Sequence, residues 1–155
     1  MQIKIDDLTH PKVADLLQQH LDDMYATSPA ESVHALDLEK LRAPDIIFWT
    51  VWQQQDLLGC GALKTLSTQH GEIKSMRTAR QHLRKGVAAQ MLTHIIQQAK
   101  ARGLQRLSLE TGSQPFFRPA ITLYKTHGFV FCDPFANYKA APNSKFMTLV
   151  LGSTN

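Results

Sequence analysis

Residues 83–103 read LRKGVAAQMLTHIIQQAKARG, and this stretch decides the fold. The segment Gly86–Arg102 has apolar residues at helical spacing, which form one continuous stripe: Val87, Ala88, Met91, Leu92, Ile95, Ile96 and Ala99. Gly103 follows directly and is suited to end a helix in the left-handed conformation. The pattern predicts a long amphipathic helix with one buried face.

The start of this helix has the composition of an anion site, with Arg84, Lys85 and Gly86 in succession. The first N–H groups of a helix lack internal partners and lie at the positive end of its dipole, so a phosphate can accept several hydrogen bonds there. Gly86 permits close approach of the backbone, and the two cations add charge. These residues alone fit either a phosphate-binding loop or a plain basic loop. Neither a P-loop nor a G-x-G-x-x-G motif is present.

The flanking sequence predicts strands on both sides of this helix and further helices. Strands are expected at Gln2–Ile5, Ile46–Gln53, Leu57–Leu66, Glu72–Thr78, Leu104–Glu110, Phe129–Cys132 and Lys145–Leu151. Helices are expected from the Thr9–Pro11 start signal to Met24, over Ser32–Leu41 and over Phe117–His127. The order predicts an α/β (α+β) fold, a mixed sheet with helices on its faces.

Composition predicts one soluble globular domain that spans residues 1–155. Apolar residues make up 43% of the chain and charged residues 19%, and no linker or repeat divides it. We expect no signal peptide, and no apolar run reaches the ~20 residues that span a bilayer, so we expect a cytoplasmic protein without a membrane partner. The seven histidines show no metal-ligand spacing, and no metal is expected.

Two motifs, in order, carry a resemblance to a known family. The first is Leu83-Arg84-Lys85-Gly86-Val87-Ala88, and the second is Ala120-Ile121-Thr122-Leu123-Tyr124-Lys125-Thr126-His127-Gly128-Phe129. They resemble the pyrophosphate loop and the A-x-x-L-Y-x-x-x-G-F helix of the GNAT superfamily of N-acetyltransferases. The segments Leu109–Pro115 and Gly128–Met147 resemble its YsnE-like branch of small bacterial enzymes. The first half of the chain is similar only in the order of its elements.

The resemblance implies a GNAT fold, with a mostly antiparallel sheet of about seven strands and about four flanking helices. One position departs from the family pattern, because Leu83 stands where the loop usually has Arg or Gln. Backbone N–H groups can still bind the phosphates, and Arg84 and Lys85 remain to supply charge.

The resemblance also implies a site for acetyl-CoA. The phosphates would bind at Arg84, Lys85, Gly86, Val87 and Ala88, and the pantetheine arm would pair with the backbone of Met76, Arg77 and Thr78. An N–H group near Met76 would stabilise the oxyanion that forms as an amine attacks the thioester. Lys125 can reach a CoA phosphate or be an ordinary surface lysine.

Acetyl transfer to an amine requires an acid and a route for the amine proton. Tyr124 occupies the tyrosine position of the family helix, and its phenol can donate to the leaving sulfur, although a structural tyrosine is the alternative. Glu72 and Glu110 compete as bases, and a reaction without a dedicated protein base remains a third possibility. An exposed carboxylate at the end of a strand is more often simply solvated.

The predicted activity is acetyl transfer from acetyl-CoA to a primary amine of a small molecule, by direct attack. An alternative is a domain of this fold that binds CoA without turnover. The net charge of +4 attracts anions, but no nucleic-acid recognition motif accompanies it, so no nucleic-acid partner is expected. Acceptor specificity is assigned to the loops Thr27–Ala30 and Asp133–Ser144. Dimers are common in this family, and the sequence leaves the oligomeric state open.

Overall fold

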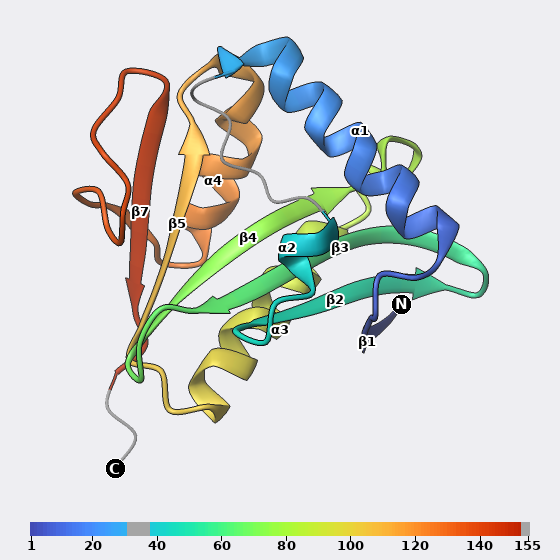
Figure 1. The fold of residues 1–155 in the computed structure, drawn as a ribbon, viewed down its shortest axis with the longest axis horizontal. Coiled ribbons are helices and arrows are strands. Elements are labelled where there is room, and N and C mark those ends of the chain that lie inside the picture. Colours follow the sequence, from blue (N-terminus) through green and yellow to red (C-terminus); the bar gives the residue numbers. More distant parts are fainter. Residues whose placement is uncertain (31–37, 153–155) are drawn as a thin grey trace.

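A computed structural model describes residues 1–30 and 38–152 of the chain (Figure 1). Its centre is a seven-stranded sheet in the order β1-β2-β3-β4-β5-β7-β6. The strands are β1 (Gln2–Ile5), β2 (Ile46–Gln53), β3 (Asp56–Thr65), β4 (His70–Thr78), β5 (Arg106–Gly112), β6 (Val130–Phe131) and β7 (Ser144–Val150). Neighbouring strands are antiparallel except β4 and β5, which are parallel. The predicted mixed, mostly antiparallel sheet is confirmed.

The helices cover both faces of this sheet. Helix α1 (Pro11–Thr27) crosses the front of β3 and β4, and α3 (Val87–Ala101) lies behind them in Figure 1. Helix α4 (Arg118–Thr126) follows β5 and is preceded by a 3₁₀ turn, Pro115–Phe117. The short helix α2 (Leu38–Leu41) is the described part of the helix expected over Ser32–Leu41, and residues 31–37 lie outside the described residues.

Two apolar cores result, one on each face of the sheet. The core behind it contains the predicted stripe of α3 packed on Trp49, Val51 and Leu63. The core in front contains α1 packed on Phe48 and Trp52. The two tryptophans therefore point to opposite faces, as expected for an odd spacing along one strand.

The ends of α3 and α4 share one cap geometry. Gly103 has φ +79°, its N–H donates to Lys100 O, and Leu104 N–H donates to Ala99 O. Gly128 closes α4 with φ +96° and the equivalent pair of bonds. This is the Schellman motif, which satisfies the last free carbonyls of a helix. The predicted helix end at Gly103 is confirmed.

The β4–β5 pair opens partway along its length. Pairing joins His70 to Arg106, Gly71 to Leu107 and Glu72 to Ser108, and then stops, although β4 continues to Thr78 and β5 to Gly112. Figure 1 shows the two strands spreading apart beyond this point, with α4 beside the gap. The interior edges of residues 73–78 and 109–112 are therefore left available for a ligand. No helix in the described part of the chain has the length and apolar character to cross a membrane.

Candidate active site

A cavity of about 290 Å³ lies where β4 and β5 separate. Its walls come from α1, from the separated parts of both strands, from α3 and α4, and from the segments around Leu83, Phe116 and Tyr138. It therefore borders both the predicted phosphate loop and the strand ends that carry Glu72 and Glu110. These parts of the chain are far apart in sequence, and the parting of the strands brings them together.

Strand β4 bulges at Ser75 beside this cavity. Cys60 pairs with Arg77 and Ala62 with Lys74, so Ser75 and Met76 together face the single residue Gly61. Ser75 has φ +55°, a left-handed conformation that is uncommon for a residue other than glycine. Bulges of this kind bend a strand and re-aim its groups, often next to active sites. The bulge coincides with the position where the sequence predicts the oxyanion donor near Met76.

The phosphate loop stands at the cavity's edge, between the lining residues Leu83 and Val87. Gly86 has φ +82°, and a Cβ placed there would meet no atom within 4 Å. The space above the first turn of α3 is thus open to a ligand, as an anion site at a helix N-terminus requires. Lys85 Nζ is 3.1 Å from His82 Nδ1 on the same loop. The residues present fit the pyrophosphate of acetyl-CoA.

Glu72 lines the cavity together with Lys74 and Tyr138. Its Oε2 accepts a hydrogen bond of 2.7 Å from the Tyr138 hydroxyl and lies 3.2 Å from Lys74 Nζ, which also donates to the Tyr138 hydroxyl at 2.8 Å. Glu72 is only 3% exposed. The expectation of an exposed, solvated strand end is wrong here, because the loop between β6 and β7 brings Tyr138 over the carboxylate.

Glu110 is the second carboxyl on the cavity wall, and its surroundings differ from those of Glu72. Burial raises the pKa of Glu110 to about 7, and the nearby Glu72 acts in the same direction while Lys74 opposes both. A carboxyl with a pKa near neutrality can accept a proton without being locked in an ion pair. Of the two predicted bases, Glu110 is the one whose carboxyl is not committed to Lys74 and Tyr138.

Tyr124 of α4 lines the same cavity. The ring packs edge-on against Phe129 at 5.7 Å between centroids, and Phe129 N–H donates to the carbonyl of Tyr124. Burial raises the pKa of the Tyr124 phenol, so the group keeps its proton near neutral pH. Among the described residues none accepts a hydrogen bond from this hydroxyl. The hydroxyl is therefore a buried donor whose proton is available to a ligand.

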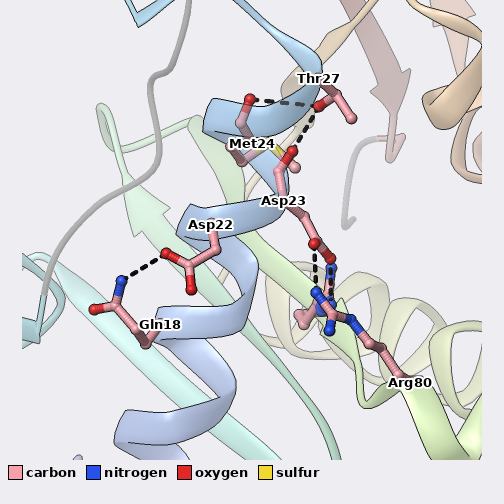
Figure 2. A network of polar contacts seen from close by, with 7 residues as sticks. Gln18, Asp22, Asp23, Met24, Thr27 and Arg80 are labelled. Atoms are coloured by element: carbon pink, nitrogen blue, oxygen red, sulfur yellow. Dashed lines mark hydrogen bonds and ion pairs between the residues drawn. The ribbon is translucent and has the colours of Figure 1, made fainter.

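On the α1 side of the cavity, Asp23 forms ion pairs with two arginines. Asp23 bonds Arg77 of β4 at 2.6 Å and Arg80 at 2.5 Å, and Figure 2 shows Arg80 reaching its carboxylate. Burial alone would raise the pKa of Asp23, but the bonds to the two arginines outweigh it and lower the pKa. His20 lies nearby, where burial and the charge of Arg77 lower its pKa to about 4. This histidine is therefore neutral at pH 7.

Phe116 and Phe117 supply an aromatic part of the cavity wall. Their rings meet edge to face at 5.1 Å. Phe117 lies directly over Gly112 at the end of β5, where a Cβ would come within 2.1 Å of the ring. A glycine is therefore needed at this strand end for the wall to form.

Most of the residues predicted for the site border the cavity: Glu72, Glu110, Tyr124, Met76, Arg77, Thr78, Val87 and Ala88. Arg84, Lys85 and Gly86 lie in the adjoining loop. Lys125 is not among the lining residues, and its Nζ stands over the Phe131 ring at 4.9 Å. Arg77 Nη2 pairs with Asp23, whereas Arg77 Nε has no hydrogen-bond partner among the described residues.

Sequence reasoning missed Lys74 and the bulge at Ser75. Lys74 sits between two predicted site residues, Glu72 and Met76, but nothing in a strand pattern distinguishes a buried lysine from an exposed one. Ser75 carries no glycine or asparagine signal for its positive φ. Within residues 1–30 and 38–152, no group of three or more His, Cys, Asp or Glu is placed to hold a metal ion.

Comparisons with known proteins show the family and the fold. Residues 13–129 match the model of the Acetyltransferase (GNAT) family. The chain is 60% identical over 148 residues to the uncharacterized N-acetyltransferase YsnE of Bacillus subtilis strain 168, covering 96% of this chain and 98% of that protein. A putative acyl-CoA N-acyltransferase from Klebsiella pneumoniae superposes with a TM-score of 0.79 at 25% identity over 97% of both chains. A GNAT family acetyltransferase from Elizabethkingia anophelis, with acetyl-CoA bound, superposes with a TM-score of 0.70 at 18% identity, over 96% of this chain and 97% of that one.

Proposed function

The chain belongs to the GNAT family of N-acetyltransferases, and on this premise we propose that it acetylates the primary amine of a small molecule inside the cavity between β4 and β5. The enzyme uses acetyl-CoA as the acetyl donor. The observation that carries the proposal is the convergence on one cavity of the open β4 edge, the phosphate loop and a carboxyl with a near-neutral pKa.

We assign donor binding to the loop and to the open edge of β4. The N–H groups at the start of α3, with Arg84 and Lys85, would hold the pyrophosphate over the open space at Gly86. The backbone of Met76–Thr78, which has no partner on β5, would pair with the pantetheine arm. Acetyl-CoA supplies a thioester whose carbonyl carbon is the electrophile.

In the proposed reaction the amine nitrogen attacks the thioester carbonyl carbon, a C–N bond forms, and the C–S bond breaks. The amine gives up one proton to the Glu110 carboxylate, and the departing thiolate takes one from the Tyr124 hydroxyl. Glu110 then releases its proton to solvent and Tyr124 regains one from solvent, so both groups return to their starting states. We favour Glu110 over Glu72 because Glu72 already accepts from Tyr138 and pairs with Lys74. The N–H near Met76, at the bulge, is the proposed oxyanion donor.

The protonation of Cys60 favours direct transfer over a covalent acyl-enzyme intermediate. Cys60 lines the cavity, but burial raises its pKa to about 12. Only the thiolate is an effective nucleophile, and this thiol stays protonated near neutral pH. Its Sγ also lies 3.2 Å from the carbonyl oxygen of Ser75, to which it donates.

The donor site is tested by titrating acetyl-CoA calorimetrically into the wild-type protein and the Gly86→Glu variant. The new carboxylate would occupy the space for the pyrophosphate and repel it, so we expect binding to fall by at least about 100-fold. Gly103→Glu is a matched control, because Gly103 ends the same helix with φ +79° and equally open surroundings. It carries the same backbone strain at a site remote from the loop.

Binding that is lost in Gly86→Glu and kept in Gly103→Glu supports the assignment. Equal losses in both variants would attribute the effect to strain and contradict it. Tight binding by the wild type with no thiol release across a broad amine panel would instead favour a CoA-binding domain without turnover.

A further inference from the structure

The charges that line the cavity are almost completely paired within the protein. Its two permanent cations are Lys74, which pairs with Glu72 at 3.2 Å, and Arg77, which pairs with Asp23 at 2.6 Å. All four side chains are largely buried. His20, the other basic residue of the wall, is neutral at pH 7 because its pKa is lowered to about 4. The described lining thus presents no uncompensated positive charge to an acceptor.

The carboxyl that remains unpaired on the described lining is that of Glu110, which is negative when deprotonated. Glu110 lines the cavity without an ion-pair partner of its own among the described residues. An ammonium or amine group near it finds a complementary partner. A carboxylate in the same place would be removed from water, would find no cation to pair with, and would face a like charge.

Part of the cavity lining is apolar and partly exposed. Phe116 is a large apolar side chain with 47% of its surface exposed, and Phe117 packs against it. Met24 of α1 also lines the cavity and directly follows Asp23, the partner of Arg77 (Figure 2). An aromatic or aliphatic body of the acceptor would cover these surfaces, and apolar surface removed from water contributes to binding in proportion to its area.

From this arrangement we infer that the acceptor is a primary amine with an apolar or aromatic body and no carboxylate beside the amine, an arylalkylamine rather than an amino acid. The inference rests on the proposed function and specifies its substrate class. Two features give the selectivity. Glu110 pairs with the amine. Lys74 and Arg77 already pair with Glu72 and Asp23, so they are not available to a carboxylate of the acceptor.

The test uses pairs of amines that differ only in a carboxylate: phenethylamine against phenylalanine, and tryptamine against tryptophan. Thiol release from acetyl-CoA gives kcat/KM for each, and we expect the amine without the carboxylate to be preferred by about 100-fold. Thermal shifts of the CoA-loaded wild-type protein with the same four compounds give a readout independent of turnover. Only phenethylamine and tryptamine are expected to raise the melting temperature.

A variant sharpens the test. Glu72→Gln removes the partner of Lys74 and leaves its charge free to meet a carboxylate, so the preference for phenethylamine over phenylalanine should shrink by about 10-fold. The readout is the ratio of the two kcat/KM values, which a general loss of activity leaves unchanged. Glu39→Gln, at an exposed position on α2, is the control and should leave the ratio as it is.

The outcomes separate this inference from the proposed function. Absence of acetyl-CoA binding and of thiol release with every amine would overturn the proposed function. Acetyl-CoA binding together with equal or better use of phenylalanine would overturn the substrate class alone. The substrate class also fails if none of the four compounds stabilises the CoA-loaded protein.

Discussion

The two halves of the β4–β5 pair are built in opposite ways. In the paired half, a chain of side-chain hydrogen bonds crosses three strands, from His70 Nε2 to Ser108 Oγ at 2.7 Å and from Ser108 Oγ to Thr148 Oγ1 at 2.9 Å. In the open half, buried polar atoms such as Ser75 Oγ and Arg77 Nε have no partner among the described residues. One half has its polar groups satisfied and the other does not.

This difference separates stability from function along a single pair of strands. Buried polar groups are normally hydrogen-bonded, and the exceptions gather where a protein binds something. The paired half fixes the point at which the strands part. The open half then exposes an unpaired strand edge, the bulge at Ser75 and the carboxyl of Glu110 to one cavity. Changes in the open half should therefore alter activity, and changes in the paired half should alter stability.

The largest effect is expected at Glu110. Glu110→Gln keeps the shape of the side chain but cannot accept a proton, so kcat/KM for the amine should fall by about 100-fold or more. In the wild type kcat/KM should rise with pH through a midpoint of about 7, because a base works in its deprotonated form and the pKa of Glu110 is raised to about 7. The variant should lose this midpoint, which a pH profile with phenethylamine measures.

Below the amine's pKa of about 10 the fraction of neutral amine also rises with pH, so the ionisation of Glu110 is expected as a break in the slope of the profile near pH 7. A variant that retains both its activity and the midpoint would remove Glu110 from the role of base. If Glu72→Gln alone abolished the midpoint, the role would pass to Glu72.

A smaller loss is expected at Tyr124, on the α4 side of the open half. Tyr124→Phe removes one hydroxyl from the cavity, and kcat should fall by about 10- to 100-fold while acetyl-CoA binding stays unchanged, since the lost group acts on the leaving sulfur. Steady-state kinetics and calorimetry measure the two effects separately. Tyr25→Phe, at an exposed position on α1, is the matched control. An unchanged kcat would assign Tyr124 to packing against Phe129.

Much of the fold around the β4–β5 pair could be predicted, because local sequence patterns determine it. The stripe from Val87 to Ala99 and Gly103 after it predict α3 and its cap. These features depend on helical periodicity and on the conformational freedom of glycine. They do not depend on contacts between distant segments.

The open half could be predicted only in outline, because its chemistry depends on such contacts. The burial of Glu72 requires Tyr138, which lies 66 positions later in the chain. The bulge at Ser75 has no signature residue, and the pairing of Arg77 with Asp23 requires α1 to cross the sheet at one particular place. From sequence alone, a carboxylate at the end of a strand is therefore predicted to be solvated, whereas Glu72 is buried in the fold.

The smallest expected effect is on stability, and it compares one serine of the paired half with one serine of the open half. Ser108→Ala breaks the hydrogen-bond chain of the paired half and leaves His70 and Thr148 without that partner, so the free energy of unfolding should fall by about 1–3 kcal/mol. Ser75→Ala removes a buried hydroxyl that has no partner within residues 1–30 and 38–152, and the change should stay within about 0.5 kcal/mol. Urea unfolding of both variants measures the difference. A loss at Ser75 as large as that at Ser108 would mean that the open half is satisfied by groups such as bound water, and the division of the strand pair into a stabilising and a working half would fail.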